Sequence, residues 1–171
     1  MRKVFTSIGP YLVIILLPIL VFWQGLFTNS IIVLGDFTGS DLLDMHLPFK
    51  YALHDSYTHG QVPLWTRYLG NGYPLFAEGQ SGPFYPPNIL LSFIEPFLAL
   101  NISIVFAFIV AGCGAYTYAR SLKMGRVISL WVGIAFMFSS FFVARQKHLN
   151  MIVVAGYLPW SLWALKKGIV H

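Results

Sequence analysis

The sequence predicts an all-α integral membrane protein, and three observations lead to this fold class. Of the 171 residues, 57% are hydrophobic and only 10% are charged, and the mean hydropathy is +0.68. Soluble domains carry roughly 25% charged residues. The chain also contains four long runs without a charge, each close to the roughly 20 residues that cross a bilayer core. We therefore expect about four transmembrane helices, near residues 10–27, 97–119, 127–144 and 149–165.

The positions of the charges predict an orientation for these spans. Seven of the eleven Lys and Arg residues lie before the first run, between the second and third, or after the fourth: Arg2, Lys3, Arg120, Lys123, Arg126, Lys166 and Lys167. All six acidic residues lie between the first and second runs. The positive-inside rule then predicts a cytoplasmic N-terminus and an external loop at residues 28–96. Because the basic residues form no single patch, we do not expect nucleic acid as a partner.

The first run is interpreted as a retained span rather than as a signal peptide. Arg2 and Lys3 give the positive start of a signal peptide, but the apolar stretch is long and no small-residue cleavage pattern follows Phe27. Pro18 is tolerated inside a membrane helix because neighbouring groups can satisfy the freed carbonyl.

The external loop is predicted to be ordered, because its many Gly and Pro residues are interleaved with aromatic ones that disordered linkers lack. Its first part has apolar residues at steps of three and four and predicts a surface helix. Pro48 inside it predicts a kink or two abutting short helices. His46, Lys50 and His54 recur on this helix, and we expect them to meet lipid headgroups, since residues 46 and 54 are too far apart for a zinc pair.

The turn RQKHLN, residues 145–150, is the exception to the charge pattern. Arg145, Lys147 and His148 crowd a short loop that the topology places outside. Two interpretations stay open: a clamp for a phosphate group, or ordinary snorkelling at a helix end.

Acidic residues of the loop are the candidates for catalysis. Asp36 follows a glycine just beyond the first span, where a carboxylate could accept a proton or hold a divalent cation. Its alternative is a turn-forming Asp. Asp41 is either a second catalytic acid or a helix N-cap with Asp44 in the style of a capping box. For Glu78 the alternative to a substrate-binding role is simple exposure.

One long ordered string carries a resemblance to a known family. The segments GDFTGSDLLDMHLPFKYAL and GQVPLWTRYLGNGYPLFAEGQSGPFYPPN, then the ARSLKMGR turn and the KHLN…LPW segment, resemble the N-terminal part of the YfhO-like bacterial membrane proteins. The likeness runs from about residue 34 to residue 167. These proteins belong among the GT-C-type glycosyltransferases, multi-span enzymes that take a sugar from a polyprenyl-phosphate carrier.

The resemblance implies a bacterial cytoplasmic membrane location, a GT-C-like fold and an acid of the first external loop in the active site. Asp36 matches the family's Gly-Asp position and Asp41 is the next candidate. The donor would be a polyprenyl-phosphate-linked sugar and the acceptor a cell-envelope glycan or lipid. No compact pair of carboxylates is present, so the resemblance leaves the metal requirement open. The remaining substrate-binding candidates are Arg145, Lys147, His148, Arg67, Trp65, Glu78 and Gln80.

Three aromatic residues of the external loop have two possible roles. Trp65, Tyr68 and Tyr73 could stack on sugar rings, and interfacial anchoring is the alternative for them.

Family members carry many more spans, so the chain is predicted to be a fragment of a longer multi-span protein that is inactive alone. The alternative function is a non-catalytic multi-span protein, either a transporter or an assembly subunit. Transporters usually place ionisable groups within their spans, and the four runs contain none.

Overall fold

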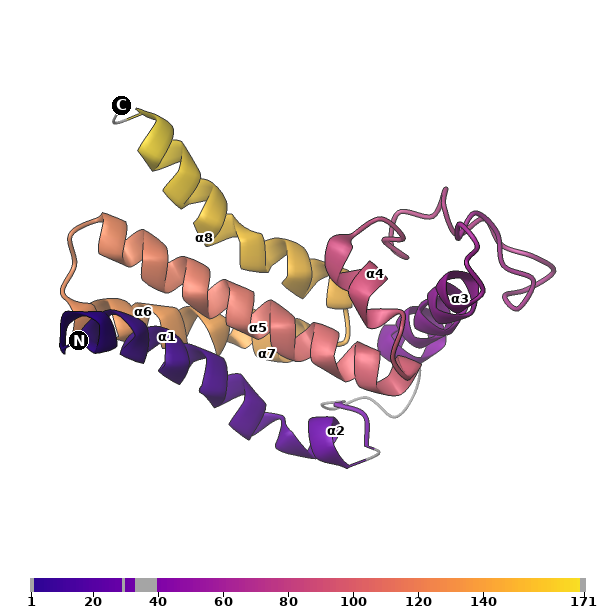
Figure 1. The fold of residues 1–171 in the computed structure, drawn as a ribbon, viewed down its shortest axis with the longest axis horizontal. Coiled ribbons are helices and arrows are strands. Elements are labelled where there is room, and N and C mark those ends of the chain that lie inside the picture. Colours follow the sequence, from indigo (N-terminus) through magenta and orange to yellow (C-terminus); the bar gives the residue numbers. More distant parts are fainter. Residues whose placement is uncertain (1, 29, 33–39, 170–171) are drawn as a thin grey trace. The chain divides into compact units, whose positions relative to one another are not determined.

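The computed structural model describes residues 2–28, 30–32 and 40–169. These residues are mostly helical, and in them there is no β-strand, only an isolated antiparallel bridge between Thr66 and Tyr73. The helices are α1 (Arg2–Val21), α2 (Trp23–Phe27), the π-helix η1 (Leu42–His46), α3 (Leu47–Thr58), α4 (Pro86–Leu91), α5 (Pro96–Ser121), α6 (Arg126–Met137), α7 (Ser140–Arg145) and α8 (Leu149–Ile169), most of them labelled in Figure 1. The all-α prediction is confirmed for this part of the chain.

The described residues form two compact units. The first is drawn from Met1–Trp23, Ile104–Gln146 and Asn150–His171, and the second from Gln24–Ser103 and Lys147–Leu149.

Glycines let the helices of the first unit approach one another closely. A Cβ at Gly112 of α5 would lie 2.8 Å from Ile14 Cγ2 of α1, and a Cβ at Gly133 of α6 would lie 2.9 Å from the carbonyl oxygen of Gly112. Small residues at helix contacts are typical of membrane bundles, where close backbone approach supplies the packing energy. Trp160 of α8 donates its indole N–H to the carbonyl of Val110 at 2.9 Å.

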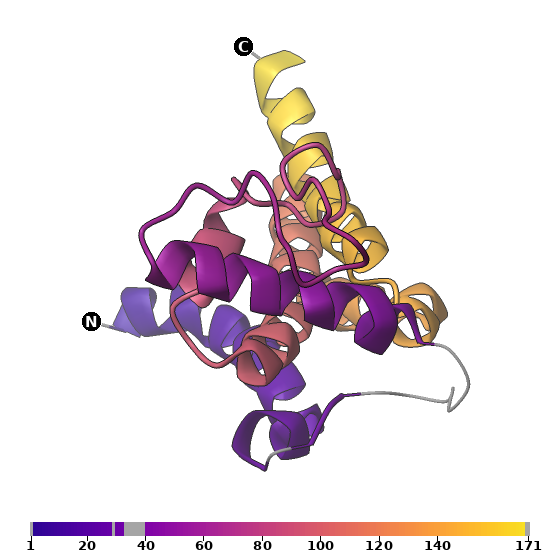
Figure 2. The ribbon, with the colours of Figure 1, turned by 90° about the vertical axis from the view of Figure 1, so that its right-hand side faces the viewer.

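The second unit is built around α3 and the chain that follows it. Phe49, Ala52 and Leu75 form its buried cluster, with Leu69 and Tyr73 packed against them. Figure 2 shows the segment after α3 looping back over that helix. Ser40 contributes a carbonyl that accepts the N–H groups of Leu43 and Asp44, which starts η1.

The predicted break at Pro48 is confirmed. The surface helix is two abutting pieces, the π-helix η1 and the α-helix α3, and Pro48 lies in the first turn of α3. The third predicted span is also interrupted, at residues 138–139 between α6 and α7.

Two helical segments of the described residues, Pro96–Ser121 and Arg126–Arg145, are long and apolar enough to cross a membrane. They correspond to the second and third predicted spans. The apolar part of α1 is the shorter stretch Ile8–Val21. The polar and aromatic residues of α8 lower its hydropathy, so the first and fourth spans stay predictions.

Candidate functional site

The second unit joins two polar segments that are far apart in the sequence. The Oδ2 atom of Asp41 lies 2.7 Å from Nδ1 of His148, 107 residues further along the chain. Asp41 precedes η1, and His148 immediately precedes α8. The side chain of Asp41 is 53% exposed and that of His148 22% exposed. Solvent, or a substrate, can therefore reach this pair.

The helix-cap alternative for Asp41 is wrong. Its backbone is in the right-handed helical region, with φ −50° and ψ −27°, and its side chain makes no capping hydrogen bond. The carboxylate is directed to His148 instead. This contact fixes the imidazole: Nδ1–H donates to the carboxylate, so in the neutral ring the lone pair is on Nε2. A carboxylate behind an imidazole is the arrangement that orients a histidine as a general base.

His46 lies beside this pair and is buried. The pKa of His46 is lowered from 6.5 to about 4, mainly by burial and to a lesser extent by Lys50 and His148, while the carboxylate of Asp41 acts in the opposite direction. His46 is consequently neutral at neutral pH. It adds no positive charge that would compete for the Asp41 carboxylate.

Lys50, one helical turn after His46, is 6% exposed. Its Nζ donates to Asn88 Oδ1 and to Ser103 Oγ, both at 2.8 Å. Burial lowers the pKa of Lys50 from 10.5 to about 8. The prediction that His46 and Lys50 meet lipid headgroups is therefore wrong, because both side chains are covered by protein. His54 is half-buried, and its Nδ1 lies 2.8 Å from the carbonyl oxygen of Ser92.

The predicted phosphate-binding residues are divided between the two units. Lys147 is half-buried in the second unit, next to His148 in the chain. Arg145 is exposed at the end of α7 in the first unit. Arg67 is exposed on the turn that follows Thr66. Asp36, the first catalytic candidate, lies outside the described residues.

Two of the predicted substrate-binding residues lie in the turn that precedes α4. Glu78 Oε2 accepts the backbone N–H groups of Gln80 and Ser81 at 2.7 and 2.8 Å, so this carboxylate holds a turn. Gln80 is exposed. Asn88 donates its amide N–H groups to the carbonyls of Ser81 and Gly82 while accepting from Lys50. The AEGQSGPFYPPN string thus carries its own internal scaffold.

Trp65 and Tyr73 have structural contacts that the sequence did not reveal. Gly72 has φ +111°, and a Cβ there would lie 2.7 Å from Cζ2 of Trp65, so the indole ring packs directly on the glycine. Tyr73 packs on Phe49 with ring centroids 5.9 Å apart. Tyr68, by contrast, is 77% exposed.

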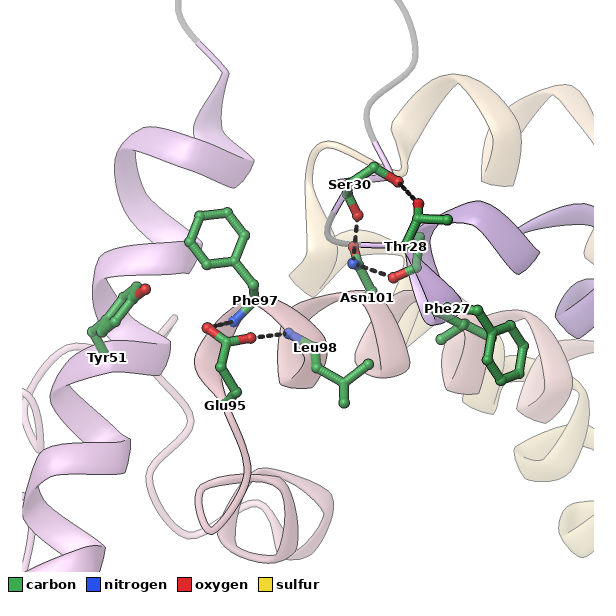
Figure 3. Close-up of a pocket in the computed structure, with 10 residues that line it drawn as sticks. Phe27, Thr28, Ser30, Tyr51, Glu95, Phe97, Leu98 and Asn101 are labelled. Carbon is green, nitrogen blue, oxygen red and sulfur yellow. Dashed lines mark hydrogen bonds between the residues drawn. The ribbon is translucent and has the colours of Figure 1, made fainter.

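A cleft of about 600 Å³ that the sequence did not indicate lies between residues 25–28 with Ser30 and the start of α5. Figure 3 shows its polar groups bonded to one another. Glu95 accepts the N–H groups of Phe97 and Leu98, and Asn101 donates to the carbonyls of Gly25 and Ser30. Phe27 and Phe97 remain exposed at 74% and 37%. The only sequence signal for this site is Glu-Pro at a helix start, a common N-terminal pattern.

The described residues contain no group of three or more His, Cys, Asp or Glu side chains placed to hold a metal ion. Comparisons of the chain with protein-family models, with curated proteins and with solved structures give no match.

Proposed function

We propose that this chain is the N-terminal part of a GT-C-type membrane glycosyltransferase in a bacterial cytoplasmic membrane. It would transfer a sugar from a polyprenyl-phosphate carrier to a cell-envelope acceptor on the outer face, with its N-terminus in the cytoplasm. The observation that carries the proposal is the 2.7 Å contact between Asp41 and His148. This contact joins the acidic loop to the basic KHLN segment. The proposed sugar transfer requires both, because one supplies a carboxylate and the other supplies the imidazole and positive charge.

The proposed reaction uses this pair as the base. The acceptor hydroxyl gives its proton to Nε2 of His148, whose imidazolium form is stabilised by Asp41. The hydroxyl oxygen forms a bond to the anomeric carbon of the donor. The bond between that carbon and the phosphate oxygen breaks, and its electron pair leaves with the polyprenyl phosphate. Attack from the face opposite the phosphate inverts the configuration.

Positive charge next to the pair supports a phosphate leaving group. Lys147 adjoins His148 in the chain, and Arg145 lies two residues before Lys147. Preorganised charges directed at a developing anion are often the largest single contribution to catalysis. We assign Lys147, which belongs to the same unit as the pair, to the departing phosphate.

The cleft in Figure 3 supports a lipid-borne donor. Its exposed apolar side chains, Phe27 and Phe97, lie where the predicted first span ends and the second begins. Its Asn101 amide is satisfied by intramolecular hydrogen bonds. The exposed rings of Phe27 and Phe97 give this mixed opening an apolar part suited to the first isoprene units of a carrier.

The test is sugar transfer by the complete natural protein in nanodiscs, with a panel of radiolabelled polyprenyl-phosphate sugars and a membrane extract as acceptor. Removing a general base costs about 100-fold in turnover, so Asp41→Asn and His148→Gln are both expected to lose activity by about that factor. Asp44→Asn is the matched control, because Asp44 is exposed three residues after Asp41. Full turnover by Asp41→Asn, or no transfer by the unmodified protein from any donor of the panel, would overturn the proposal.

A further inference from the structure

A second pocket of the second unit shares only Tyr51 with the cleft of Figure 3, and the reaction above uses none of its other lining residues. It has a volume of about 410 Å³ and lies between α3 and the turn at residues 66–73. This volume falls within the roughly 300–1,000 Å³ that small-molecule pockets occupy. All of its lining residues belong to one unit.

Two tyrosines flank the pocket. Tyr51 of α3 is 46% exposed and Tyr68 is 77% exposed, although both are large side chains next to a buried cluster. Tyr51 is steadied by an edge-on contact with Phe97, with ring centroids 6.2 Å apart. Tyrosine presents an apolar ring face together with a polar hydroxyl, which suits a ligand that has both kinds of surface.

The turn that carries Tyr68 is held rigidly. Thr66 and Tyr73 exchange backbone hydrogen bonds of 2.9 and 2.8 Å, and Trp65 packs on Gly72 at the base of the turn. Leu69 and Tyr73 pack on the buried cluster under α3. Tyr68 is thus presented by a fixed scaffold while its own side chain stays open to solvent.

Apart from the two tyrosine hydroxyls, the polar side chains of the pocket, His54 and Asp55, present hydrogen-bond acceptors. Nδ1 of His54 is engaged with the carbonyl of Ser92, so the neutral ring offers the lone pair of Nε2. The carboxylate of Asp55 is 46% exposed and has one oxygen 3.3 Å from Nδ1 of His59. No Lys or Arg lines the pocket. Because the pocket contains a carboxylate and no Lys or Arg, it disfavours binding of a phosphate or any other anion.

We propose that this pocket binds a neutral hexose ring of the glycan acceptor, stacked against Tyr68 and Tyr51 with its hydroxyls donating to Asp55 and His54. In naming the acceptor, the inference rests on the proposed glycosyltransferase function. Acceptor-rich polar groups match a ligand whose hydroxyls are donors, and aromatic faces match the C–H face of a sugar ring. A quaternary ammonium ion is the rival ligand, since it also favours aromatic rings beside a carboxylate.

The test measures binding alone, on the natural protein in nanodiscs of zwitterionic lipid. Saturation-transfer NMR and calorimetry are run with neutral gluco-, galacto- and N-acetylglucosamine oligosaccharides, and with tetramethylammonium. We expect at least one oligosaccharide to bind. Loss of one aromatic contact is expected to weaken binding by about tenfold in Tyr68→Ala. Tyr68→Phe keeps the ring and should stay near the unmodified affinity, whereas Asp55→Asn should weaken binding.

Phe84→Ala is the control, because Phe84 is an exposed aromatic of the same unit outside the pocket lining. Binding of no oligosaccharide, equal loss in the Phe84→Ala and Tyr68→Ala variants, or Tyr68-dependent binding of tetramethylammonium alone would each overturn the inference. Sugar binding by a protein that transfers no sugar would refute the proposed function and leave this pocket assigned. If the protein transfers sugar but the Tyr68→Ala variant binds oligosaccharide as tightly as the unmodified protein, the proposed function stands and the assignment of this pocket is wrong.

Discussion

Lys50 Nζ lies 2.8 Å from Asn88 Oδ1, and these two side chains bind α3 to the chain that precedes α5. Asn88 also donates to the carbonyls of Ser81 and Gly82. One amide therefore satisfies a buried ammonium and two backbone acceptors. A Cβ at Gly82 would lie 2.9 Å from the same amide nitrogen, and Gly82 has φ +56°, so a glycine is required beside it.

Asn88→Ala is expected to destabilise the protein. The substitution removes one of the two hydrogen-bond acceptors of a buried ammonium and two donors to backbone carbonyls. Loss of a hydrogen bond to a charged group costs about 2 kcal/mol. Thermal unfolding followed by circular dichroism would measure the loss. Asn71→Ala is the control, because Asn71 is exposed on the turn at residues 66–73. Equal stability of the two variants would contradict the role of Asn88.

The buried His46 predicts a pH dependence of stability. Its pKa is about 4 in the folded protein and 6.5 in the unfolded chain, mainly because burial disfavours the charged ring. Between these values the unfolded state binds more protons, so stability rises with pH. The contribution of about 3 kcal/mol is fully present above pH 6.5 and is lost as the pH falls to 4.

Urea unfolding at several pH values between 4 and 7 would measure this slope. His46→Gln should flatten it. His59→Gln should leave it intact, because the side chain of His59 is 67% exposed. An unchanged slope in the His46→Gln variant would assign the pH dependence to another group.

Local features of the sequence predicted the local structure well. Pro48 indicated the junction of η1 and α3, because a proline lacks the N–H that a helix interior needs. The placement of Lys50 depended on tertiary contacts instead. Its partners, Asn88 and Ser103, lie 38 and 53 residues away, and only their side chains make burial of an ammonium tolerable. Spacing on α3 alone could not distinguish this covered face from a solvated one.

The candidate site was predictable only in outline. Asp41 stood out as an acid of the external loop and His148 as a polar residue of a short turn, but nothing in the sequence fixes a contact across 107 residues. Glu78 looked like a substrate-binding acid and proves to hold a turn, because its partners are backbone N–H groups two and three residues on. Such side-chain-to-backbone bonds are typical of acidic residues in turns.

Gly72→Ala is expected to destabilise the turn that carries Tyr68. The residue has φ +111°, which an L side chain rarely adopts, and the new methyl group would clash with the Trp65 ring. A strained backbone of this kind costs about 2 kcal/mol. Thermal unfolding would measure this loss. Gly79→Ala is the control, since no atom lies within 4 Å of its Cβ position. If both variants unfold at the same temperature, Trp65 does not constrain Gly72.

The orientation of the chain in the membrane gives a last prediction. Arg120, Lys123 and Arg126 lie where the two helical segments that are long and apolar enough to span meet in the chain. The positive-inside rule predicts that such a short basic turn lies in the cytoplasm. The other end of α5 and the acidic loop before it then face outward. Single cysteines at exposed Arg67 and Lys123, each in a Cys113→Ala background, would test this on spheroplasts with a membrane-impermeant maleimide.

We expect the Arg67→Cys protein to be labelled at once and the Lys123→Cys protein only after the membrane is permeabilised. His59→Cys supplies a second exposed position in the acidic loop and should behave like Arg67→Cys. Labelling of position 123 from outside, with positions 59 and 67 protected, would invert the topology. Asp41 and His148, which share a unit with Arg67, would then face the cytoplasm. In that orientation an acceptor in the cell envelope could not reach them, and the proposed sugar transfer would be wrong.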